Sequence, residues 1–422
     1  MSKSIAVIGG WAAGMMALAQ ISEQHPQWVR IVLFEKNSSL WAKVIISWWG
    51  RCNVTTGYYR RKDLEDKYIR GSDRVREAIG QFGPRKIYQW FENHGVPLKT
   101  EKDMRVFPQS DNGKDIVWVF EQIIKTSSIE CLLGTWIETI DHNGRQFVLT
   151  TKDKDYNFDA VIIATGGQAY RQTWSTGDAY TWAQHLWHTI THLGPSLNSF
   201  LTSDKWMHAL SGIAFEHAKI TINNQEKKPA AWPLLFTHFG LSGPLTFIIS
   251  AYSSFETIDH NHPLLVNLMI DSNADTSIWN KRLLEASSQT PKKQLDTILS
   301  QYLPKRLADT ILHEQFPWQA SQAIGQLSKT TRLWIAEFLW WWWTISVVWR
   351  RPGDEFVTAG GVSLEEVDNN TMMSTIVPWL FFAGEILDID GVTGWYNLTS
   401  SRATGYCAGK NAIEWVRKIE KF

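Results

Sequence analysis

The stretch IAVIGGWAAG, residues 5–14, indicates the fold class, because a short apolar strand runs directly into a glycine-rich turn. An apolar helical segment follows, and a second strand, Val29–Phe34, ends at Glu35. In a G-x-G-x-x-G turn the first glycine makes the tight turn, the second lets a pyrophosphate approach the backbone, and the third lets helix and strand pack closely. Gly9 and Gly14 hold the outer positions, and Glu35 can accept hydrogen bonds from ribose hydroxyls. The unit predicts a dinucleotide-binding α/β domain.

The middle position of this motif holds Trp11 instead of glycine. An indole there occupies space that the pyrophosphate normally uses, so this residue contradicts the rest of the motif. An ordinary strand–turn–helix connection without a nucleotide is the alternative interpretation. The order of strand, helix, second strand and acidic residue favours the nucleotide site.

The composition excludes several classes of protein. The 422 residues suffice for two or three domains. Lys+Arg and Asp+Glu each number 42, so the formal net charge is zero and no nucleic-acid partner is expected. Cys52, Cys131 and Cys407 are too few and too far apart for a disulfide framework, which favours a reducing compartment. The chain opens without a signal-peptide pattern, and its longest apolar run is well short of the roughly 20 residues that cross a bilayer. We therefore expect a cytoplasmic protein without a membrane partner.

Two textures divide the chain. Strand and helix patterns alternate up to about residue 192 and resume near residue 350. Between them, short alternating strands are followed by helical segments. We predict a split domain, 1–192 and 350–422, with 193–349 inserted into it.

Local patterns predict individual elements. Apolar spacing favours helices over 75–95 and 114–126, and Asn143-Gly144 is typical of a hairpin turn, which needs positive φ. Thr290-Pro291 predicts a helix start, with a capping hydroxyl and a proline at the first helical position.

Several segments carry a more specific signal than the glycine turn. They are IAVIGGWAAGMMA, VLFEKNSSLWAKVIISWWGRCNVT, MRVFPQSD, VIIATGGQAY with STGDAY, LFTHFGLSGP, FVTAGGVSLEEVD, and LFFAGEILDIDGVTGWYNL with ATGY. Together they resemble the bacterial NAD(P)/FAD-dependent oxidoreductases of the aminoacetone oxidase type, flavoproteins that include a bile-acid dehydro-reductase. The resemblance runs from the first strand to the last helix. It implies a two-part, Rossmann-like FAD-binding domain of the glutathione-reductase type, interrupted by a β-barrel-like insert with a helical piece.

The resemblance also implies a cofactor site for FAD. Gly9, Trp11, Ala12, Ala13 and Gly14 would surround the pyrophosphate, Glu35 and Lys36 the adenosine ribose, and Ile137 the adenine. Arg51, Cys52 and Asn53 would lie along the flavin, and Thr165 and Gly166 would close the cradle. Gly384, Glu385, Asn397 and Leu398 would contact the ribityl chain and the pyrimidine edge of the flavin ring.

The resulting hypothesis is an FAD-dependent oxidoreductase acting on an unidentified small molecule, with NAD(P)H or oxygen as candidate redox partners. Arg51, His238 and Tyr396 are the candidate catalytic residues: Arg51 suits an anionic group, and His238 is the acid/base candidate. One alternative is a binding or scaffold protein of flavoprotein fold that has lost FAD because tryptophan replaces cradle glycines. Another is an NAD-only dehydrogenase, which would not need the late A-G-E segment. The sequence leaves the oligomeric state open.

Tryptophan is unusually frequent, with 24 residues against 19 Phe and 11 Tyr. Those that stand where the family usually has glycine are Trp11, Trp41, Trp48, Trp49, Trp174, Trp187, Trp379 and Trp395. Glycine at such turns serves a positive φ or a close ligand, and positive φ costs a bulky residue on the order of 1–2 kcal/mol. Three explanations compete: a diverged chain that no longer binds flavin, a rebuilt pocket, or written tryptophans that do not report the true residues. We favour the third, because four successive indoles, Trp340–Trp343, would point to all sides of a helix.

Other candidate sites are weaker. His185, His188 and His192 have the spacing of one helix face, but no cysteine lies near them and we predict no metal. Cys52 lacks a resolving partner, so packing is its expected role, with a redox thiol as the alternative. Ser242 lies outside any nucleophile-elbow context.

Overall fold

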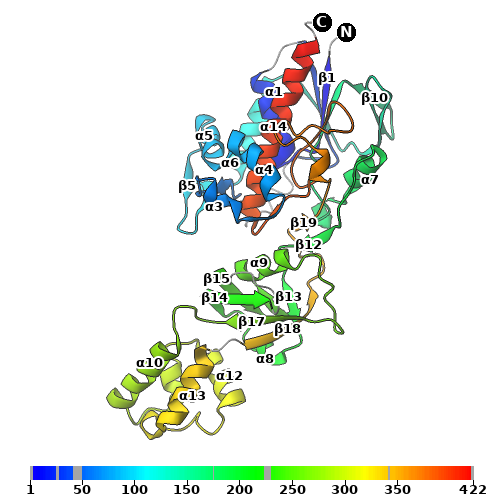
Figure 1. The fold of residues 1–422 in the computed structure, drawn as a ribbon. Helices are drawn as coiled ribbons and strands as arrows, with labels where there is room; N and C mark the ends of the chain where they lie inside the picture. The colour runs from blue at the N-terminus through cyan, green and yellow to red at the C-terminus, as the bar shows by residue number, and fades with distance from the viewer. Residues whose placement is uncertain are drawn as a thin grey trace. The chain divides into compact units, whose positions relative to one another are not determined.

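The computed structural model describes residues 3–24, 28–40, 50–173, 175–222, 230–340 and 343–419. The chain forms two compact units, Met1–Ser196 with Glu355–Phe422 and Leu197–Asp354 (Figure 1). The insertion was predicted over 193–349, and the second unit runs from 197 to 354, so the two boundaries differ by four and five residues.

A five-stranded parallel sheet forms the centre of the first unit. Its strand order is β20-β11-β1-β2-β7, and each neighbouring pair is parallel. The strands are Ser4–Ile8 (β1), Arg30–Glu35 (β2), Ile129–Leu133 (β7), Ala160–Ile163 (β11) and Leu380–Phe382 (β20). β1, β11 and β20 are buried along their whole length, as is typical of parallel strands covered on both faces. Strands from both ends of the chain therefore share one sheet.

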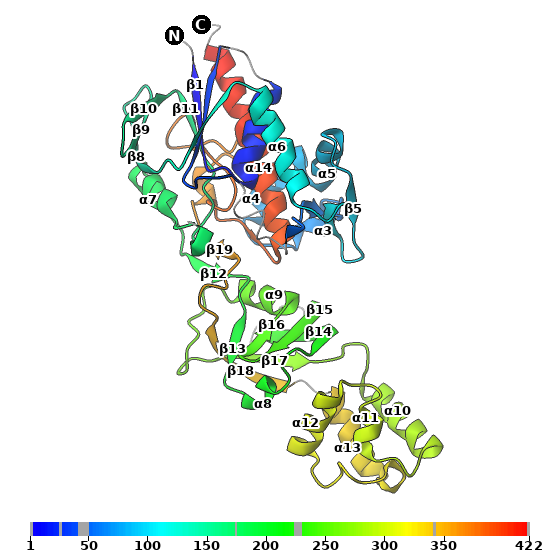
Figure 2. The same cartoon turned by 180° about the vertical axis from the view of Figure 1, so that it is seen from behind.

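Two helices from opposite ends of the chain lie side by side on this sheet, α1 (Ala12–Glu23) and α14 (Gly394–Ile419) (Figures 1 and 2). Their contact depends on glycines of α14. A Cβ atom at Gly405 would overlap the carbonyl oxygen of Ala13, and one at Gly409 would overlap that of Ala17. Small residues thus let the two backbones approach closely.

The remaining elements of this unit are short. Its other helices are α3 (Lys62–Glu65), α4 (Ser72–Phe82), α5 (Pro84–Asn93), α6 (Lys114–Thr126) and α7 (Asp178–His185). Its small antiparallel sheets have the orders β3-β6-β5, β10-β9-β8, β12-β19 and β21-β4. These strands are Thr55–Thr56 (β3), Tyr68–Arg70 (β4), Leu98–Thr100 (β5), Arg105–Pro108 (β6), Ile137–His142 (β8), Phe147–Thr151 (β9), Asp155–Phe158 (β10), Gly194–Ser196 (β12), Val357–Ala359 (β19) and Asp390–Gly391 (β21).

The second unit combines a closed barrel with helices. The barrel order is β13-β16-β15-β14-β17-β18, closed by pairing of β18 with β13. The strands are Phe200–Thr202 (β13), Ala214–Ile222 (β14), Ala230–Thr237 (β15), Gly240–Ser242 (β16), Leu264–Met269 (β17) and Trp343–Arg350 (β18). The helices are Lys205–His208 (α8), Pro244–Tyr252 (α9), Thr276–Gln289 (α10), Leu295–Leu299 (α11), Lys305–Gln315 (α12) and Lys329–Trp340 (α13). Helices α10–α13 gather beyond one end of the barrel (Figure 2), and their buried side chains belong to the same core as those of the strands. The prediction of an α/β fold with a barrel-like and helical second part is confirmed.

Several local predictions need correction. The helix expected over 75–95 is two helices, because Gly83 interrupts it and Pro84 starts the second. The helix start expected at Thr290 is wrong: Thr290 caps the carboxyl end of α10, where its backbone N–H and its hydroxyl both donate to the carbonyl oxygen of Ala286. The helix expected over 114–126 is confirmed as α6.

The four consecutive tryptophans do not share a helix. Trp340 is the last residue of α13, and Trp343 is the first residue of β18. Trp343 is buried in the core, with its ring 5.5 Å from that of Trp206 and 6.1 Å from that of Phe338. The inference that four indoles point to all sides of one helix is therefore wrong. Within the described ranges, no helix has the length and apolar character needed to span a membrane.

Candidate functional site

A cleft in the first unit lies at the carboxyl ends of β1, β2 and β11, beside the start of α1. This edge of a parallel sheet is where α/β folds bind ligands. Of the residues expected to hold the cofactor, those that line the cleft are Gly9, Trp11, Ala12, Ala13, Glu35, Lys36, Ile137, Thr165, Gly166, Gly384 and Glu385. Those that do not line it are Gly14, Arg51, Cys52, Asn53, Asn397 and Leu398.

The outer glycines of the motif are sterically required. Gly9 has φ +104°, and a Cβ atom there would lie 2.5 Å from the carbonyl oxygen of Ala164. A Cβ atom at Gly14 would overlap the carbonyl oxygen of Gly9. The turn is therefore drawn tightly against both β11 and α1, and the free amides at the start of α1 border the cleft.

Trp11 caps the start of α1 in an ordinary backbone conformation. Its φ of −122° and ψ of −158° are extended, and its carbonyl oxygen accepts from the N–H of Met15 at 2.7 Å. Of the two reasons for a glycine at such turns, a positive φ does not apply to Trp11, and the close approach of a ligand remains. Its indole borders the cleft, so what matters at this position is whether the indole takes up room that a pyrophosphate would need.

Glu35 is held at the end of β2 by backbone donors. Its Oε2 accepts from the N–H of Gly10 at 2.7 Å, and its Oε1 accepts from the backbone N–H of Asn37 at 2.9 Å. The side-chain amide of Asn37 also donates to Oε1, at 2.7 Å. The carboxylate thus joins the glycine turn to the strand end, at the place where Rossmann-type folds bind a ribose.

Lys36, the next residue, lines the cleft and contacts three other residues that line it. Its ammonium lies 2.7 Å from Oδ2 of Asp178 and 3.0 Å from the hydroxyl of Thr176. It also lies 4.1 Å from the ring centre of Trp136, a cation–π distance. Asp178 and Trp136 line the cleft, as does Trp182. Sequence reasoning assigned none of these three a role, although the quoted segment STGDAY includes Asp178.

The second part of the chain completes the cleft. Gly384 has φ +82°, and a Cβ atom there would lie 2.8 Å from that of Ala13. Oε1 of Glu385 accepts from the N–H of Thr358 at 2.9 Å. Residues from both halves of the split unit therefore meet at one edge of the sheet.

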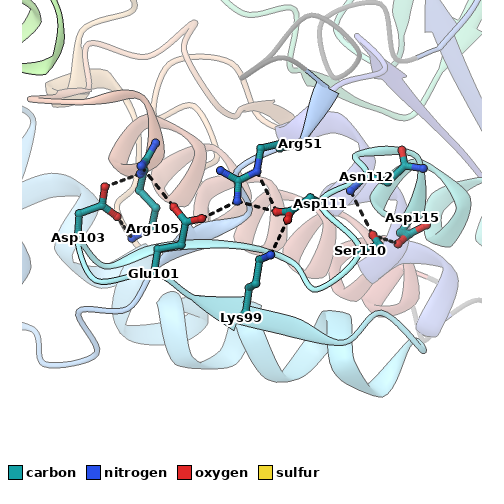
Figure 3. Close-up of polar contacts among 9 residues, drawn as sticks. All are labelled: Arg51, Lys99, Glu101, Asp103, Arg105, Ser110, Asp111, Asn112 and Asp115. Atoms are coloured by element: carbon teal, nitrogen blue, oxygen red, sulfur yellow. Dashed lines mark hydrogen bonds and ion pairs between the residues drawn. The ribbon is translucent and has the colours of Figure 1, made fainter.

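Arg51 is held by carboxylates. Its Nη2 lies 2.5 Å from Oε1 of Glu101 and 2.6 Å from Oδ1 of Asp111, which also pairs with Lys99 (Figure 3). The pKa of Arg51 is raised, mainly by its hydrogen bond to Glu101. The pKa of Asp111 is lowered by its hydrogen bonds to Lys99, which has the larger effect, and to Arg51. The guanidinium also lies 4.0 Å from the ring centre of Phe107. An anionic group of flavin or substrate, which Arg51 was expected to bind, would have to compete with Glu101 and Asp111 for the guanidinium.

Two asparagines expected at the flavin differ sharply. The amide of Asn397 is fully used: its Oδ1 accepts from the N–H of Gly391, and its Nδ2 donates to the carbonyl oxygens of Gly391 and Thr393. The amide of Asn53 is completely buried, and neither its nitrogen nor its oxygen has a hydrogen-bond partner among the described residues. A buried amide without a partner is costly, so Asn53 indicates a polar group that completes this place.

The candidate catalytic residues lie in different units. Tyr396 is fully buried in α14, and burial raises the pKa of its phenol above the ordinary range. Arg51 belongs to the same unit, whereas His238 belongs to the barrel unit. His238 is exposed in the turn between β15 and β16, with its ring 5.0 Å from that of Phe239. The catalytic roles of the three remain predictions.

The histidine triplet does not share a helix face. Helix α7 ends at His185, which is exposed and pairs with Asp141 at 2.7 Å. His188 lies beyond the helix, buried, with Nε2 2.7 Å from the hydroxyl of Ser374. The spacing argument fails because the chain leaves the helix between the two residues. Among the described residues, no cluster of three metal-ligating side chains occurs.

The tryptophans at glycine positions divide into three groups. Trp187 and Trp379 have φ of +69° and +70°, which confirms that these turns need the left-handed conformation. Trp395, like Trp11, does not: it is buried in the first turn of α14. Trp41, Trp48, Trp49 and Trp174 lie outside the described residues.

Comparison with known proteins agrees with this geometry. The family model described as "HI0933-like protein Rossmann domain" matches residues 3–411. A 3-dehydro-bile acid delta(4,6)-reductase of Clostridium scindens is 24% identical over 425 residues, covering 97% of this chain and 99% of the relative. A ribosomal RNA dihydrouridine synthase of Haemophilus influenzae is 26% identical over 423 residues, covering 95% and 96%. The FrdA subunit of Escherichia coli quinol fumarate reductase has a similar fold, with a TM-score of 0.50 at 15% identity, covering 99% of this chain and 71% of FrdA.

These matches confirm the resemblance that the sequence motifs carry, and none supports a chain that has lost FAD. A glycine turn, an acidic strand end and a split parallel sheet, matched over residues 3–411, make this chain a member of the HI0933-like Rossmann family of flavoprotein oxidoreductases.

Proposed function

We propose that this chain is an FAD-dependent reductase that adds hydride to a carbon–carbon double bond conjugated with a carbonyl group, in a small-molecule substrate. The observation that carries the cofactor part is the cleft: it joins a sterically required glycine turn, the start of α1 and the carboxylate of Glu35. A helix start with free amides suits the pyrophosphate, and a carboxylate at the end of β2 suits the ribose.

The residues around the cleft fit FAD at both ends. Ile137 borders the adenosine end beside Glu35, and Gly384 borders the cleft from the second part of the chain. The buried amide of Asn53, which does not line this cleft, would supply a donor and an acceptor for the flavin edge. When bound, FAD supplies hydride transfer, and the chain binds, orients and shields it. The phenol of Tyr396, kept protonated by burial, is the proposed proton donor, with His238 as the second candidate.

The substrate class follows from the chemistry that two relatives' names describe. A delta(4,6)-reductase of 3-dehydro-bile acids reduces double bonds in conjugation with a ketone. A dihydrouridine synthase reduces the ring double bond of uracil, which also neighbours a carbonyl. The shared chemistry is reduction of an activated double bond. The zero net charge of this chain favours a small molecule over RNA.

Flavin content tests the cofactor part. The full chain is incubated with FAD, freed of unbound flavin by gel filtration and denatured, and the released flavin is counted. We expect stoichiometric flavin in the natural sequence and a marked loss in Glu35→Ala. Glu130→Ala is the matched control, because Glu130 is an exposed carboxylate on the adjacent strand, paired with Arg30 outside the cleft. Unchanged flavin in Glu35→Ala contradicts the assignment of the ribose site.

Anaerobic turnover tests the substrate part. Bound flavin is reduced with NADH or NADPH, and its reoxidation is followed after addition of a cyclic enone, a 3-oxo-4-ene steroid, a uridine-containing RNA or oxygen. We expect the enones to reoxidise the flavin fastest and to yield saturated ketones. Reoxidation by oxygen alone, or by RNA alone, refutes the proposed substrate class.

A further inference from the structure

Side chains of alternating charge connect Arg51 to the hairpin of β5 and β6 and to the turn that follows it (Figure 3). Nη2 of Arg51 lies 2.5 Å from Oε1 of Glu101 and 2.6 Å from Oδ1 of Asp111, which also accepts from Nε of Arg51 at 2.9 Å. Each carboxylate holds a second cation: Oε2 of Glu101 lies 3.3 Å from Nη2 of Arg105, and Oδ2 of Asp111 lies 2.6 Å from Nζ of Lys99. We call these five side chains the charge network.

The charge network fixes the guanidinium of Arg51 from several sides. Besides the two carboxylates, the ring of the completely buried Phe107 contacts it, with the ring centre 4.0 Å from the guanidinium carbon. A lone exposed ion pair stabilises a protein little, whereas several charges in one network can hold a side chain in place. Arg51 is therefore anchored to the hairpin.

The backbone is left-handed on both sides of this ion pair. Cys52 has φ +55° and Asp111 has φ +56°. Residues other than glycine adopt this conformation where the surrounding contacts hold it. Here the N–H of Gly113 donates to the carbonyl oxygen of Gly50 at 2.7 Å, and a Cβ atom at Gly113 would lie 2.8 Å from that of Cys52. The turn at Cys52 is thus packed against the segment that carries Asp111.

This turn determines where Asn53 lies. On one side the thiol of Cys52 donates to the carbonyl oxygen of Asn53 at 3.8 Å, and on the other the N–H of Val54 donates to the carbonyl oxygen of Val106 at 2.8 Å. The side-chain amide of Asn53 is completely buried, and neither its nitrogen nor its oxygen has a partner among the described residues. Because an unmatched buried amide is costly, the turn holds a polar group ready for a ligand.

We propose that Glu101 and Asp111 are positioning residues for the cofactor: by anchoring Arg51, they hold the turn at Cys52 and preset the amide of Asn53 for a polar edge of the flavin. This proposal rests on the proposed function for the identity of the ligand. Neither carboxylate lines the cleft, and both are engaged with cations, so they act through Arg51 and not by contact with the cofactor.

The first test compares dissociation constants for FAD, measured by fluorescence titration of the full chain freed of flavin. Glu101→Gln and Asp111→Asn remove a charge and keep the shape of the side chain. We expect each to raise Kd by about tenfold, within the range for residues that share one network. Asp103→Asn is the matched control: Asp103 belongs to the same hairpin, and its described ion pair is with Arg105 at 2.7 Å. It should leave Kd within about twofold.

A second comparison separates positioning from a general loss of stability. If Glu101 acts through Arg51, then Glu101→Gln should have no further effect on Kd in a chain that already carries Arg51→Met. A substitution that only destabilises the hairpin would add its effect to that of Arg51→Met. Additive effects therefore overturn the positioning role.

Hydrogen exchange tests the turn without any flavin. In the flavin-free wild-type chain we expect the amide of Gly113 to be protected, because its bond to Gly50 forms before the ligand binds. Asp111→Asn should lower this protection. Unprotected exchange of Gly113 in the wild-type chain overturns the preset turn, even if a variant does not fold.

Failure of this proposal can be told apart from failure of the proposed function. A wild-type chain that binds no FAD contradicts the proposed function, and with it the role of Glu101 and Asp111 toward the cofactor. Wild-type binding with an unchanged Kd in both charge-removing variants, or with an equal loss in Asp103→Asn, overturns the positioning role alone.

Discussion

Replacing Trp187 by glycine should stabilise the first unit relative to replacing it by alanine. Trp187 follows the last turn of α7, where its N–H donates to the carbonyl oxygen of Gln184 at 3.0 Å. The N–H of His188 donates to the carbonyl oxygen of Ala183 at 2.9 Å. This pair of bonds is the Schellman motif, which places one residue in the left-handed region, and Trp187 has φ +69°. Glycine is the residue that this position favours.

The magnitude follows from the backbone, because the indole contributes little. Trp187 is 81% exposed, whereas Trp379, also left-handed, stacks on Trp415 with ring centres 3.7 Å apart and would lose that contact. A non-glycine residue pays about 1–2 kcal/mol for the left-handed conformation, and the greater chain entropy of unfolded glycine offsets part of this. We expect Trp187→Gly to exceed Trp187→Ala in stability by about 1 kcal/mol, or about 2–4 °C in Tm for a unit of this size.

The assay is urea unfolding of both variants, followed by far-ultraviolet circular dichroism. Trp318 is the matched control: it is 88% exposed, and its φ is not positive. There, glycine should be equal to or less stable than alanine. If Trp187→Ala is as stable as Trp187→Gly, or if both positions respond alike, the assignment of left-handed strain to Trp187 is refuted.

Three further outcomes are expected. Burial lowers the pKa of His188, so the imidazole binds a proton more tightly in the unfolded chain than in the folded one. The free energy of unfolding is therefore highest above pH 6.5 and falls as the pH drops below that value. The total loss is about 1.4 kcal/mol for each pH unit by which folding lowers the pKa. His188→Gln should remove this slope in urea unfolding measured against pH, and a slope that persists speaks against His188. Gly405→Ala should destabilise by several kcal/mol, because its Cβ would overlap the backbone of Ala13, whereas Gly80→Ala, in α4 with open space around it, should stabilise by about 0.5–1 kcal/mol in the same assay. Trp11→Gly should raise FAD affinity, measured by equilibrium titration, because the indole borders the cleft beside the pyrophosphate amides; equal or weaker affinity would show that the indole does not obstruct FAD.

Elements whose patterns are local were predictable. The limits of α6 match the apolar spacing over 114–126, because one amphipathic face and the helix period suffice to define it. The hairpin at Asn143-Gly144 is confirmed for the same reason: the side chain of Asn143 accepts from the N–H groups of Arg145 and Gln146. A positive φ, expected at both turn residues, occurs at Gly144 (+85°) but not at Asn143, and the second strand begins at Phe147 instead of Arg145. These contacts lie within four residues of each other.

Elements that depend on distant neighbours were not. Thr290 has the residues of a helix start, yet it ends α10, and the chain after it pairs with a distant segment: the carbonyl oxygens of Pro291 and Lys293 accept from the N–H groups of Gly325 and Ile324. Trp340 ends a helix, whereas Trp343 begins a strand because it pairs with Leu268 on the neighbouring strand β17. The intrinsic preference of a residue for helix or strand carries no information about such partners, which come from other parts of the chain.

For the candidate site, the sequence alone was sufficient to predict the glycine turn, the acidic residue at the end of β2 and the family, because the first two lie within one strand–turn–helix–strand unit and the motifs of the third are contiguous. Tertiary structure decided which polar groups stay available. It engages Arg51 with Glu101 and closes the amide of Asn397 on Gly391, and it leaves the buried amide of Asn53 without a partner among the described residues. The physical reason is that burial penalises every unmatched charge and amide, and the matching partners come from segments far apart in the chain, which no local pattern of residues records.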